Sequence, residues 1–345
     1  MRAYRIVGWR EPPRLVDADV PEPGPGQVLV RVAGCGLCHS DLTMAGISAE
    51  IGEAIGWRVP FTLGHETAGR VAEVGAGVTA VRPGDPVALV SPASCGTCRL
   101  CARGLDASCP DGLAGRGYGR DGGLAEFVLA GSVRELVPLR GLDPATAGPL
   151  TDAGATAYHA VRRVLPRLHP DGTAVVIGAG GLGAFAVQFL RALGGARVVA
   201  IDTNPARLDH ARELGADDAL PGVDGGTAAR VAELTGGRGA DAVLDFVGAD
   251  ATIAAGVAMV GPAGAFGLVG AAGGGLRAPW SGTLPRDGEV FAFQGSSIAD
   301  VREVVALAER GAIRNDVEVF PLDRVEDAYA ALDKGSLRGR AVVRP

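Results

Sequence analysis

Hydrophobic and polar residues alternate in blocks through the second half of the chain. The apolar run Thr173–Ile177 leads directly into glycines, and Leu182–Leu193 then carries apolar residues at helical spacing, which predicts a strand followed by a helix. Strands are also predicted at Arg197–Ile201, Ala242–Val247, Ala265–Val269 and Glu289–Phe293, and helices at Pro205–Leu214 and Ala251–Val260. Such alternation predicts a doubly wound parallel sheet with helices on both faces.

The first 150 residues follow a different pattern. Short β-branched runs broken by Gly and Pro, at Gln27–Ala33, Ala68–Val74 and Ala125–Leu129, predict an irregular and mainly antiparallel β domain. The last 50 residues predict an amphipathic helix at Ile298–Arg310 and then elements similar to the first domain, at Val317–Phe320, Val325–Leu332 and Arg340–Val343. We therefore predict an α/β protein in which a nucleotide-binding domain (153–294) is inserted into a catalytic domain (1–152 and 295–345).

Composition narrows the class of protein. A chain of 345 residues with 47% hydrophobic residues can build two cores. No apolar run reaches the roughly 18 residues of a membrane helix, and the N-terminus has no signal-peptide pattern, which favours a cytoplasmic protein without a membrane partner. Its net charge of -6, with acids and bases interspersed, excludes a basic stripe for nucleic acid. A small-molecule substrate is the remaining expectation.

Four of the six cysteines form a cluster with metal-ligand spacing. Cys95, Cys98, Cys101 and Cys109 follow the pattern C-x2-C-x2-C-x7-C. Two-residue gaps let a tight turn aim successive thiolates at one tetrahedral zinc, and four protein ligands leave no open position, so we interpret the site as structural. An iron–sulfur cluster and disulfides are the alternatives, and a reducing cytosol without other redox motifs disfavours both.

A second group of candidate ligands is scattered along the chain. Cys38 lies in Gly36–Asp41, His65 in Gly64–Glu66, and Asp152 at the start of the predicted nucleotide-binding domain. Each residue alone is more often core packing than ligand. Together, in a chain that already carries a zinc cluster, they offer three ligands and leave a fourth position open, as in catalytic zinc sites.

A glycine motif predicts a dinucleotide site. The segment 178–183 fits G-x-G-x-x-G with Gly178, Gly180, Gly181, Leu182 and Gly183, and although 54 glycines make chance matches common, this one follows a predicted strand and opens a helix. Asp202 ends the next strand, where a carboxylate accepts from ribose hydroxyls and repels a 2'-phosphate. NAD is therefore predicted in preference to NADP, although Arg207 could accommodate that phosphate.

These motifs, from Cys35 to Arg340, resemble those of the zinc-dependent medium-chain alcohol dehydrogenases. The chain departs from the two-cysteine, one-histidine ligand set at Asp152, which is similar to the bacterial NAD-dependent secondary alcohol dehydrogenases. The resemblance implies a GroES-like catalytic domain, an inserted Rossmann domain, and a homotetramer whose nucleotide-binding domains pair through edge strands near 265–269 and 289–293. A dimer is the alternative.

The resemblance also implies residue roles. Ser40 lies beside the alcohol oxygen and passes on its proton, and Asp41 orients His65. Glu66 is either an exchangeable metal ligand or a residue that contacts the ligands without binding the metal. The histidine that ends the proton relay in some relatives is Thr43 here, and Cys35 is expected to be a packed core thiol. The remaining positions match cofactor contacts: His39 and Arg340 at the pyrophosphate, Arg207 at the adenosine ribose, and Val247, Val269, Gly295 and Ser296 around the nicotinamide.

The predicted function is reversible hydride transfer between NAD and apolar primary or secondary alcohols and ketones. The mostly apolar segment Met44–Phe61 is interpreted as a loop that forms one wall of the substrate pocket. A polyol or amino-alcohol dehydrogenase on the same scaffold is the nearest alternative. A dinucleotide-sensing or crystallin-like binding protein is another. It is disfavoured because a protein without turnover has no use for an open zinc position.

Overall fold

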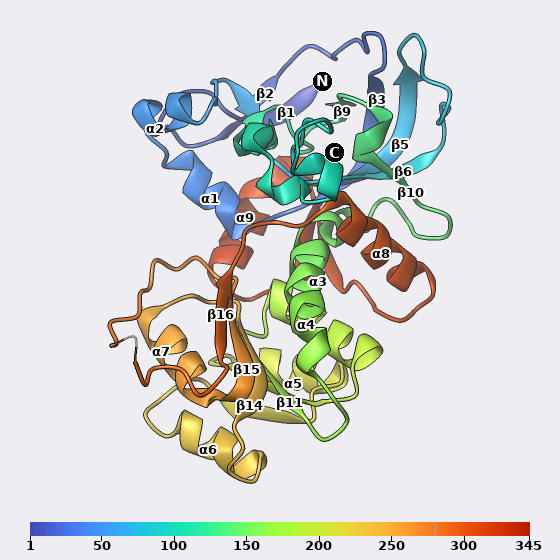
Figure 1. The fold of residues 1–345 in the computed structure, drawn as a ribbon. Helices are drawn as coiled ribbons and strands as arrows, with labels where there is room; N and C mark the ends of the chain where they lie inside the picture. The colour runs from blue at the N-terminus through green and yellow to red at the C-terminus, as the bar shows by residue number, and fades with distance from the viewer. Residues whose placement is uncertain (280) are drawn as a thin grey trace. The chain divides into compact units, whose positions relative to one another are not determined.

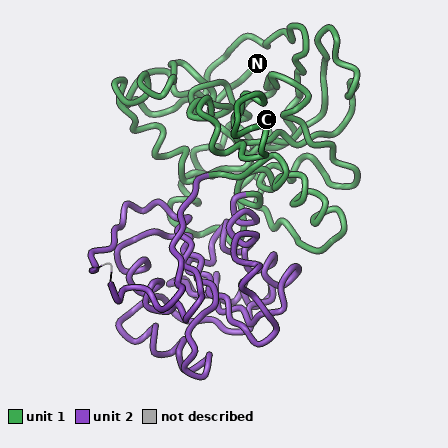
Figure 2. The backbone as a smooth tube through the Cα atoms, in the orientation of Figure 1, with its two compact units in different colours: residues 1–155, 295–345 green, residues 156–294 purple. Residues whose placement is uncertain are grey.

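A computed structural model describes residues 1–279 and 281–345. The chain forms two compact units, coloured separately in Figure 2: unit 1 contains residues 1–155 and 295–345, and unit 2 contains residues 156–294. The domain boundaries expected from the sequence are 152/153 and 294/295. The chain passes from one unit to the other at 155/156 and at 294/295.

Unit 2 is built on a parallel sheet with strand order β13-β12-β11-β14-β15-β16. Chain order therefore reverses between β11 and β14, which is where nucleotides bind in sheets of this kind. Buried valine and isoleucine side chains of β11 and β12 pack with Phe266 in the core of this unit. The strands are β11 (Thr173–Ile177), β12 (Arg197–Asp202), β13 (Asp218–Pro221), β14 (Ala240–Asp245), β15 (Val260–Leu268) and β16 (Glu289–Ala292).

Helices connect these strands (Figure 1). Helix α5 illustrates how the sequence starts them: Pro205 occupies its first turn, and the Asn204 side chain accepts a hydrogen bond from the Ala206 amide. The prediction for α5 was correct to within one residue. The helical segments are α3 (Ala153–Val164), η6 (Leu165–Arg167), α4 (Gly181–Leu193), α5 (Pro205–Glu213), α6 (Thr227–Leu234) and α7 (Asp250–Met259).

Unit 1 is mainly antiparallel. Its largest sheet has the order β10-β6-β5-β3-β18-β17, with β9 also pairing with β3, and a smaller sheet has the order β2-β1-β4. The C-terminal strands extend the sheet that the N-terminal segment begins, because β18 pairs with β3. The strands are β1 (Arg2–Ile6), β2 (Arg14–Asp17), β3 (Val28–Gly36), β4 (Phe61–Thr62), β5 (Glu66–Val74), β6 (Pro86–Leu89), β7 (Gly115–Arg116), β8 (Gly119–Arg120), β9 (Phe127–Ala130), β10 (Leu136–Pro138), β17 (Val317–Pro321) and β18 (Arg340–Arg344).

Short helices of unit 1 carry several of the candidate residues. The segment Met44–Phe61, predicted as a loop, contains the helix α2 (Ala49–Ala54). After this helix, the rings of Trp57 and Phe61 pack edge to face in the core. Ile51, by contrast, is 55% exposed. The helical segments are α1 (His39–Ala45), α2 (Ala49–Ala54), η1 (Cys101–Arg103), η2 (Asp106–Ser108), η3 (Pro110–Leu113), η4 (Val133–Glu135), η5 (Gly148–Thr151), α8 (Ile298–Glu309), η7 (Leu322–Arg324) and α9 (Val325–Asp333).

In the part of the chain that the structure describes, no helix has both the length and the apolar character needed to cross a bilayer.

Candidate active site

Three elements of unit 1 bring the scattered candidate ligands together. Strands β3 and β5 are antiparallel neighbours in which Gly36 faces Glu66. Cys38 therefore follows the end of β3 close to His65, which immediately precedes β5. Asp152 ends the short helix η5, which packs against both strands.

One potential donor atom from each of Cys38, His65, Glu66 and Asp152 lies within 4.8 Å of the other three. The His65 Nε2 atom is 3.5 Å from Asp152 Oδ2. Its Nδ1 atom is 3.3 Å from Asp41 Oδ1, while Asp41 Oδ2 accepts a hydrogen bond from the Cys38 amide at 3.0 Å. This is the arrangement in which a carboxylate orients a metal-binding histidine, so the residues present fit a zinc ion.

Opposing effects act on the pKa of His65. Burial by itself disfavours the protonated imidazole, but the carboxylates of Asp41 and Asp152 outweigh burial and raise the pKa of His65. A metal ion binds only the neutral imidazole, so protons compete for this site as the pH falls.

Glu66 is fully buried and lies beside Arg340 of β18. Burial raises the pKa of Glu66, and the Arg340 guanidinium opposes that shift. Arg340 donates to Glu66 Oε1 and, at 2.7 Å, to the Leu37 carbonyl oxygen. Glu66 Oε2 is buried and has no hydrogen-bond partner among the described residues. One oxygen is thus held by Arg340, and the second is available to the ligand group.

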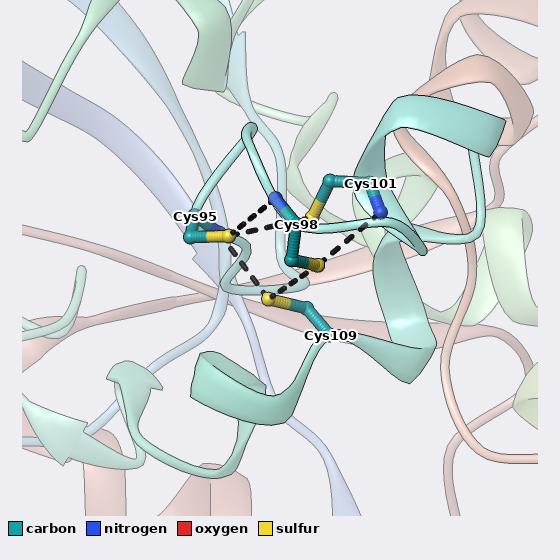
Figure 3. Close-up of side chains that lie close together, drawn as sticks. All are labelled: Cys95, Cys98, Cys101 and Cys109. Atoms are coloured by element: carbon teal, nitrogen blue, oxygen red, sulfur yellow. Dashed lines mark hydrogen bonds between the residues drawn. The ribbon is translucent and has the colours of Figure 1, made fainter.

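The four-cysteine cluster is assembled as its spacing predicted. Figure 3 shows the four side chains around one centre, and their sulfur atoms all lie within 4.8 Å of one another. The Cys95–Cys101 and Cys98–Cys109 sulfur pairs are 3.9 and 4.0 Å apart. These distances are near the roughly 3.8 Å edge of a tetrahedron with zinc–sulfur bonds of about 2.3 Å, and far longer than a disulfide. The donor set therefore fits structural zinc.

Backbone amides support the cluster as thiolates. The Cys98 amide donates to Cys95 Sγ at 3.3 Å, and the Cys101 amide donates to Cys98 Sγ at 3.4 Å. Hydrogen bonds from the Thr97 and Cys98 amides lower the pKa of Cys95 to about 6. Asp106, in the same segment, pairs with Arg134 and accepts from the Ile298 amide of α8 at 3.1 Å, which ties the cluster segment to the rest of unit 1.

Replacing Cys98 by alanine is expected to lower thermal stability, because it removes one of four ligands from a closed metal site. If the site contributes about 3 kcal/mol, the melting temperature of a unit of this size should fall by roughly 6–12 °C. Calorimetry and elemental analysis on the same sample should show lower stability and one zinc fewer. A Cys98 variant as stable as the parent would show that the cluster is not structural.

In unit 2, the glycine motif forms the turn from β11 into α4. Gly178 has φ +84°, and a Cβ atom at Gly183 would lie 1.9 Å from the Gly178 carbonyl oxygen, so a side chain is excluded there. Gly180 precedes the first residue of α4, and no side chain caps it. Gly181 and Leu182 supply further amides of the first turn. This uncapped amide end suits a pyrophosphate.

Asp202 ends β12 beside this turn. Its Oδ2 atom accepts from the Ala179 amide at 2.9 Å, and its Oδ1 atom accepts from the Asn204 amide at 2.8 Å. Arg207 Nη1 is 3.9 Å from Asp202 Oδ2, and a Cβ atom at Gly180 would lie 3.5 Å from it. The motif, Asp202 and Arg207 thus form one group at the carboxyl end of the sheet.

The other candidate cofactor residues are divided between the units. Val247 follows β14 and Val269 follows β15 in unit 2. His39 and Ser40 are exposed in the first turn of α1 in unit 1, and Gly295 and Ser296 begin its C-terminal part. Arg340 is also in unit 1, beside Glu66, and its cofactor contact remains a prediction. Cys35 is fully buried, as predicted.

Comparisons with known proteins agree with this geometry. A family model described as "Alcohol dehydrogenase GroES-like domain" matches residues 24–141, and one described as "Zinc-binding dehydrogenase" matches residues 181–310. The chain is 37% identical to an NAD-dependent alcohol dehydrogenase of Sulfolobus acidocaldarius, over 100% of this chain and 99% of the relative. The chain belongs to the zinc-dependent medium-chain alcohol dehydrogenase family.

Two further relatives extend the comparison. The chain is 34% identical to a D-arabinose 1-dehydrogenase (NADP(+)) of Saccharolobus solfataricus, covering 100% of this chain and 97% of the relative. The crystal structure of the alcohol dehydrogenase from Aeropyrum pernix superimposes with a TM-score of 0.91 at 35% identity, covering 100% of both chains. The family, the α/β fold of GroES-like and Rossmann domains, and alcohol dehydrogenase as the enzyme class, all predicted from the sequence, are confirmed.

Sequence reasoning missed one residue next to the dehydrogenase ligand group. Tyr329 of α9 is buried, and burial together with the Asp41 carboxylate raises the pKa of its hydroxyl. Tyr329 occupies an apolar position of an amphipathic helix, so its pattern in the sequence does not distinguish it from a core residue. Its closeness to Asp41, 288 residues earlier, comes from the tertiary structure.

Replacing Arg340 by methionine is expected to destabilise this dehydrogenase strongly. The change leaves the Glu66 carboxylate buried without its cation, and breaking a buried ion pair from one side costs about 3–5 kcal/mol. Denaturant unfolding measures the change in free energy. The double variant Arg340→Met/Glu66→Gln should recover much of the loss. Equal losses in the single and double variants would contradict a stabilising pair.

Proposed function

We propose that this alcohol dehydrogenase transfers hydride reversibly between NAD and apolar primary or secondary alcohols and ketones, with a catalytic zinc held by Cys38, His65 and Asp152. The observation that supports it is the single donor group formed by these three side chains. Glu66 belongs to the same donor group and is held by Arg340 through one oxygen. We assign it as an exchangeable ligand, so that the three donors leave one tetrahedral position open for substrate when Glu66 does not bind the metal. NAD is favoured by Asp202 at the end of β12.

When bound, zinc supplies Lewis acidity that favours loss of a proton from a hydroxyl group. The chain's own residues then have two tasks. Asp41 fixes the ring of His65 so that Nε2 faces the other donors. The exposed Ser40 hydroxyl takes the substrate proton on Oγ and passes its own proton on to solvent. Thr43, one turn further along α1, is the next hydroxyl on that side of the helix.

For the nucleotide, the chain supplies backbone donors and one carboxylate. The amides at the start of α4 bind the pyrophosphate, and Asp202 accepts from the adenosine ribose hydroxyls. A carboxylate oxygen has more than one acceptor site, so Asp202 can hold its two backbone amides and the ribose together. Arg207 flanks the same ribose.

Assembly and location complete the proposal. We propose a homotetramer in which β16, the edge of the unit 2 sheet, takes part in pairing, because Val290 on this strand is 48% exposed. A cytoplasmic location fits a cluster of four unpaired thiolates, since reducing conditions preserve them.

Formation of NADH with simple secondary alcohols tests the proposed activity. Purified protein is assayed with cyclohexanol and 2-butanol, before and after a chelator and after zinc is restored. We expect turnover, its loss on chelation and its recovery with zinc. Absence of NADH with every alcohol tested would refute the proposal, and turnover untouched by complete removal of zinc would refute the metal's role.

A second candidate is a sugar or polyol dehydrogenase. The similarity to a protein named D-arabinose 1-dehydrogenase favours it. Parallel assays with D-arabinose and glycerol decide between the two, because a polar pocket would give a higher kcat/KM for these substrates than for cyclohexanol.

A further inference from the structure

Asp245 is a buried carboxylate with no role so far. It is the last residue of β14, it is fully buried, and it lies opposite Ile177 of β11 in the parallel sheet. Chain order reverses between these two strands, so Asp245 stands beside the glycine turn at the carboxyl end of the sheet. Residues at this point of such a sheet face the nucleotide site.

The side chain of Asp245 holds the loop that follows its own strand. Its Oδ1 atom accepts from the Val247 amide at 2.8 Å and from the Gly248 amide at 3.0 Å. This loop presses Val247 against the glycine turn, because a Cβ atom at Gly178 would lie 2.8 Å from Val247 Cγ2. The carboxylate therefore fixes the position of Val247 relative to Gly178.

The main chain of Asp245 holds the neighbouring loop. Its carbonyl oxygen accepts from the Val269 and Gly270 amides, both at 2.9 Å. The two loops also bond to each other, since the Ala272 amide donates to the Val247 carbonyl oxygen at 3.1 Å. One residue thus anchors both loops, one through its side chain and the other through its backbone.

A buried carboxylate is a costly way to hold a turn. Desolvation of a charge is unfavourable unless hydrogen bonds compensate it, and Asp245 Oδ2 has no such partner in the described part of the chain. An uncharged acceptor could bind the same two amides. The carboxylate therefore constrains the loop that carries Val247, one of the two valines expected around the nicotinamide.

We propose that Asp245 is a positioning residue for the nicotinamide half of the cofactor. Its side chain fixes the loop that carries Val247, to which the loop after Val269 is hydrogen-bonded, and it has no direct part in binding the adenosine half. This inference rests on the proposed function, in which NAD is the cofactor. It predicts that loss of Asp245 separates the binding of NAD from the binding of ADP-ribose, which lacks the nicotinamide.

The test compares three variants with the parent. Asp245→Ala removes the acceptor, and Asp245→Asn keeps one acceptor oxygen without the charge. Asp241→Ala is the matched control: Asp241 lies on the same strand and accepts from the Thr173 amide at 2.7 Å, but it lies at the opposite end of the strand. Binding of NAD and of ADP-ribose is measured by titration calorimetry, and kcat and KM by NADH formation.

We expect Asp245→Ala to weaken NAD binding about tenfold, with ADP-ribose binding changed less than about twofold. Its kcat should fall by roughly ten- to a hundredfold, because a small misplacement of the reacting carbon slows hydride transfer. Asp245→Asn should restore most of both losses, and Asp241→Ala should match the parent in both titrations.

Parallel loss of NAD and ADP-ribose binding would overturn the inference, because it would show that Asp245 supports the whole nucleotide site. An Asp245→Ala protein that binds and turns over like the parent would overturn it as well. If Asp245→Ala does not fold, Asp245→Ser, which keeps a shorter acceptor, takes its place in the same titrations. A parent that binds neither NAD nor ADP-ribose would instead refute the proposed function.

Discussion

Replacing Cys38 by alanine is expected to lower kcat/KM for alcohol oxidation by at least about a thousandfold, because a Lewis acid contributes several kcal/mol and each 1.4 kcal/mol is about tenfold. The thiolate is one of the three proposed ligands, and without it the group keeps His65, Asp152 and Glu66, whose other oxygen is held by Arg340, so zinc should be bound much less tightly. Steady-state kinetics and elemental analysis on the same preparation should show the lost activity and one zinc fewer per chain.

The chain offers matched controls for this result. Cys35→Ala removes a cysteine only three residues away that is fully buried and lies outside the ligand group, so it should keep both zinc ions and most of the activity. Asp152→Ala should behave like Cys38→Ala, whereas Asp152→Cys keeps an anionic ligand and should retain zinc. A Cys38→Ala protein with two zinc ions and the parent's turnover would contradict the assignment.

The sequence predicted the parallel sheet well because its pattern is local. Strand β11 has the predicted bounds, and α4 begins one residue before the predicted start. Strand β15 was predicted from Ala265 but begins at Val260, since two glycines, a proline and Ala263 with φ +60° obscure its first half. Glycine and proline interrupt the apolar pattern and so conceal a strand whose pairing is set by its neighbours.

The helix α2 was not predicted from the sequence, because it depends on tertiary contacts. The segment Met44–Phe61 was interpreted as a mostly apolar loop. In the structure Gly52 is helical, and a Cβ atom there would lie 2.3 Å from the Trp9 ring, which packs on the helix at this point. The glycine makes room for a residue 43 positions away, and no local pattern reports that requirement.

The candidate site was predictable to different degrees. Spacing alone predicted the four-cysteine cluster, because its ligands are local in sequence. The second ligand group is scattered along the sequence, and Cys38, His65 and Asp152 were connected only because the same chain carries the four-cysteine cluster. The Arg340–Glu66 pair joins residues 274 positions apart through the pairing of β18 with β3, and neither residue's neighbours in the sequence indicate the other. Roles that depend on such contacts require the structure.

Asp202 is expected to determine the preference of the enzyme for NAD over NADP. With NAD, its carboxylate gains charge-assisted hydrogen bonds to neutral ribose hydroxyls, each contributing roughly 1.5–3 kcal/mol. With NADP, those bonds are lost and a phosphate dianion meets an anion. Since each 1.4 kcal/mol is about tenfold, kcat/KM should favour NAD by at least on the order of a hundredfold. Arg207, 3.9 Å from Asp202, should soften this preference without reversing it.

The structure sharpens the variants that test this preference. Asp202→Ala should lose efficiency with NAD and gain with NADP, and adding Thr203→Arg should extend the gain by pairing with the phosphate. Because Asp202 also holds the Ala179 and Asn204 amides, Asp202→Asn is the matched control, which removes the charge and keeps one acceptor oxygen. If Asp202→Asn gains with NADP as much as Asp202→Ala does, charge repulsion rather than the shape of the turn sets the choice. Equal use of both cofactors by the parent would show that the Asp202 carboxylate does not lie against the ribose. A full preference for NAD in the Asp202→Ala protein would show the same.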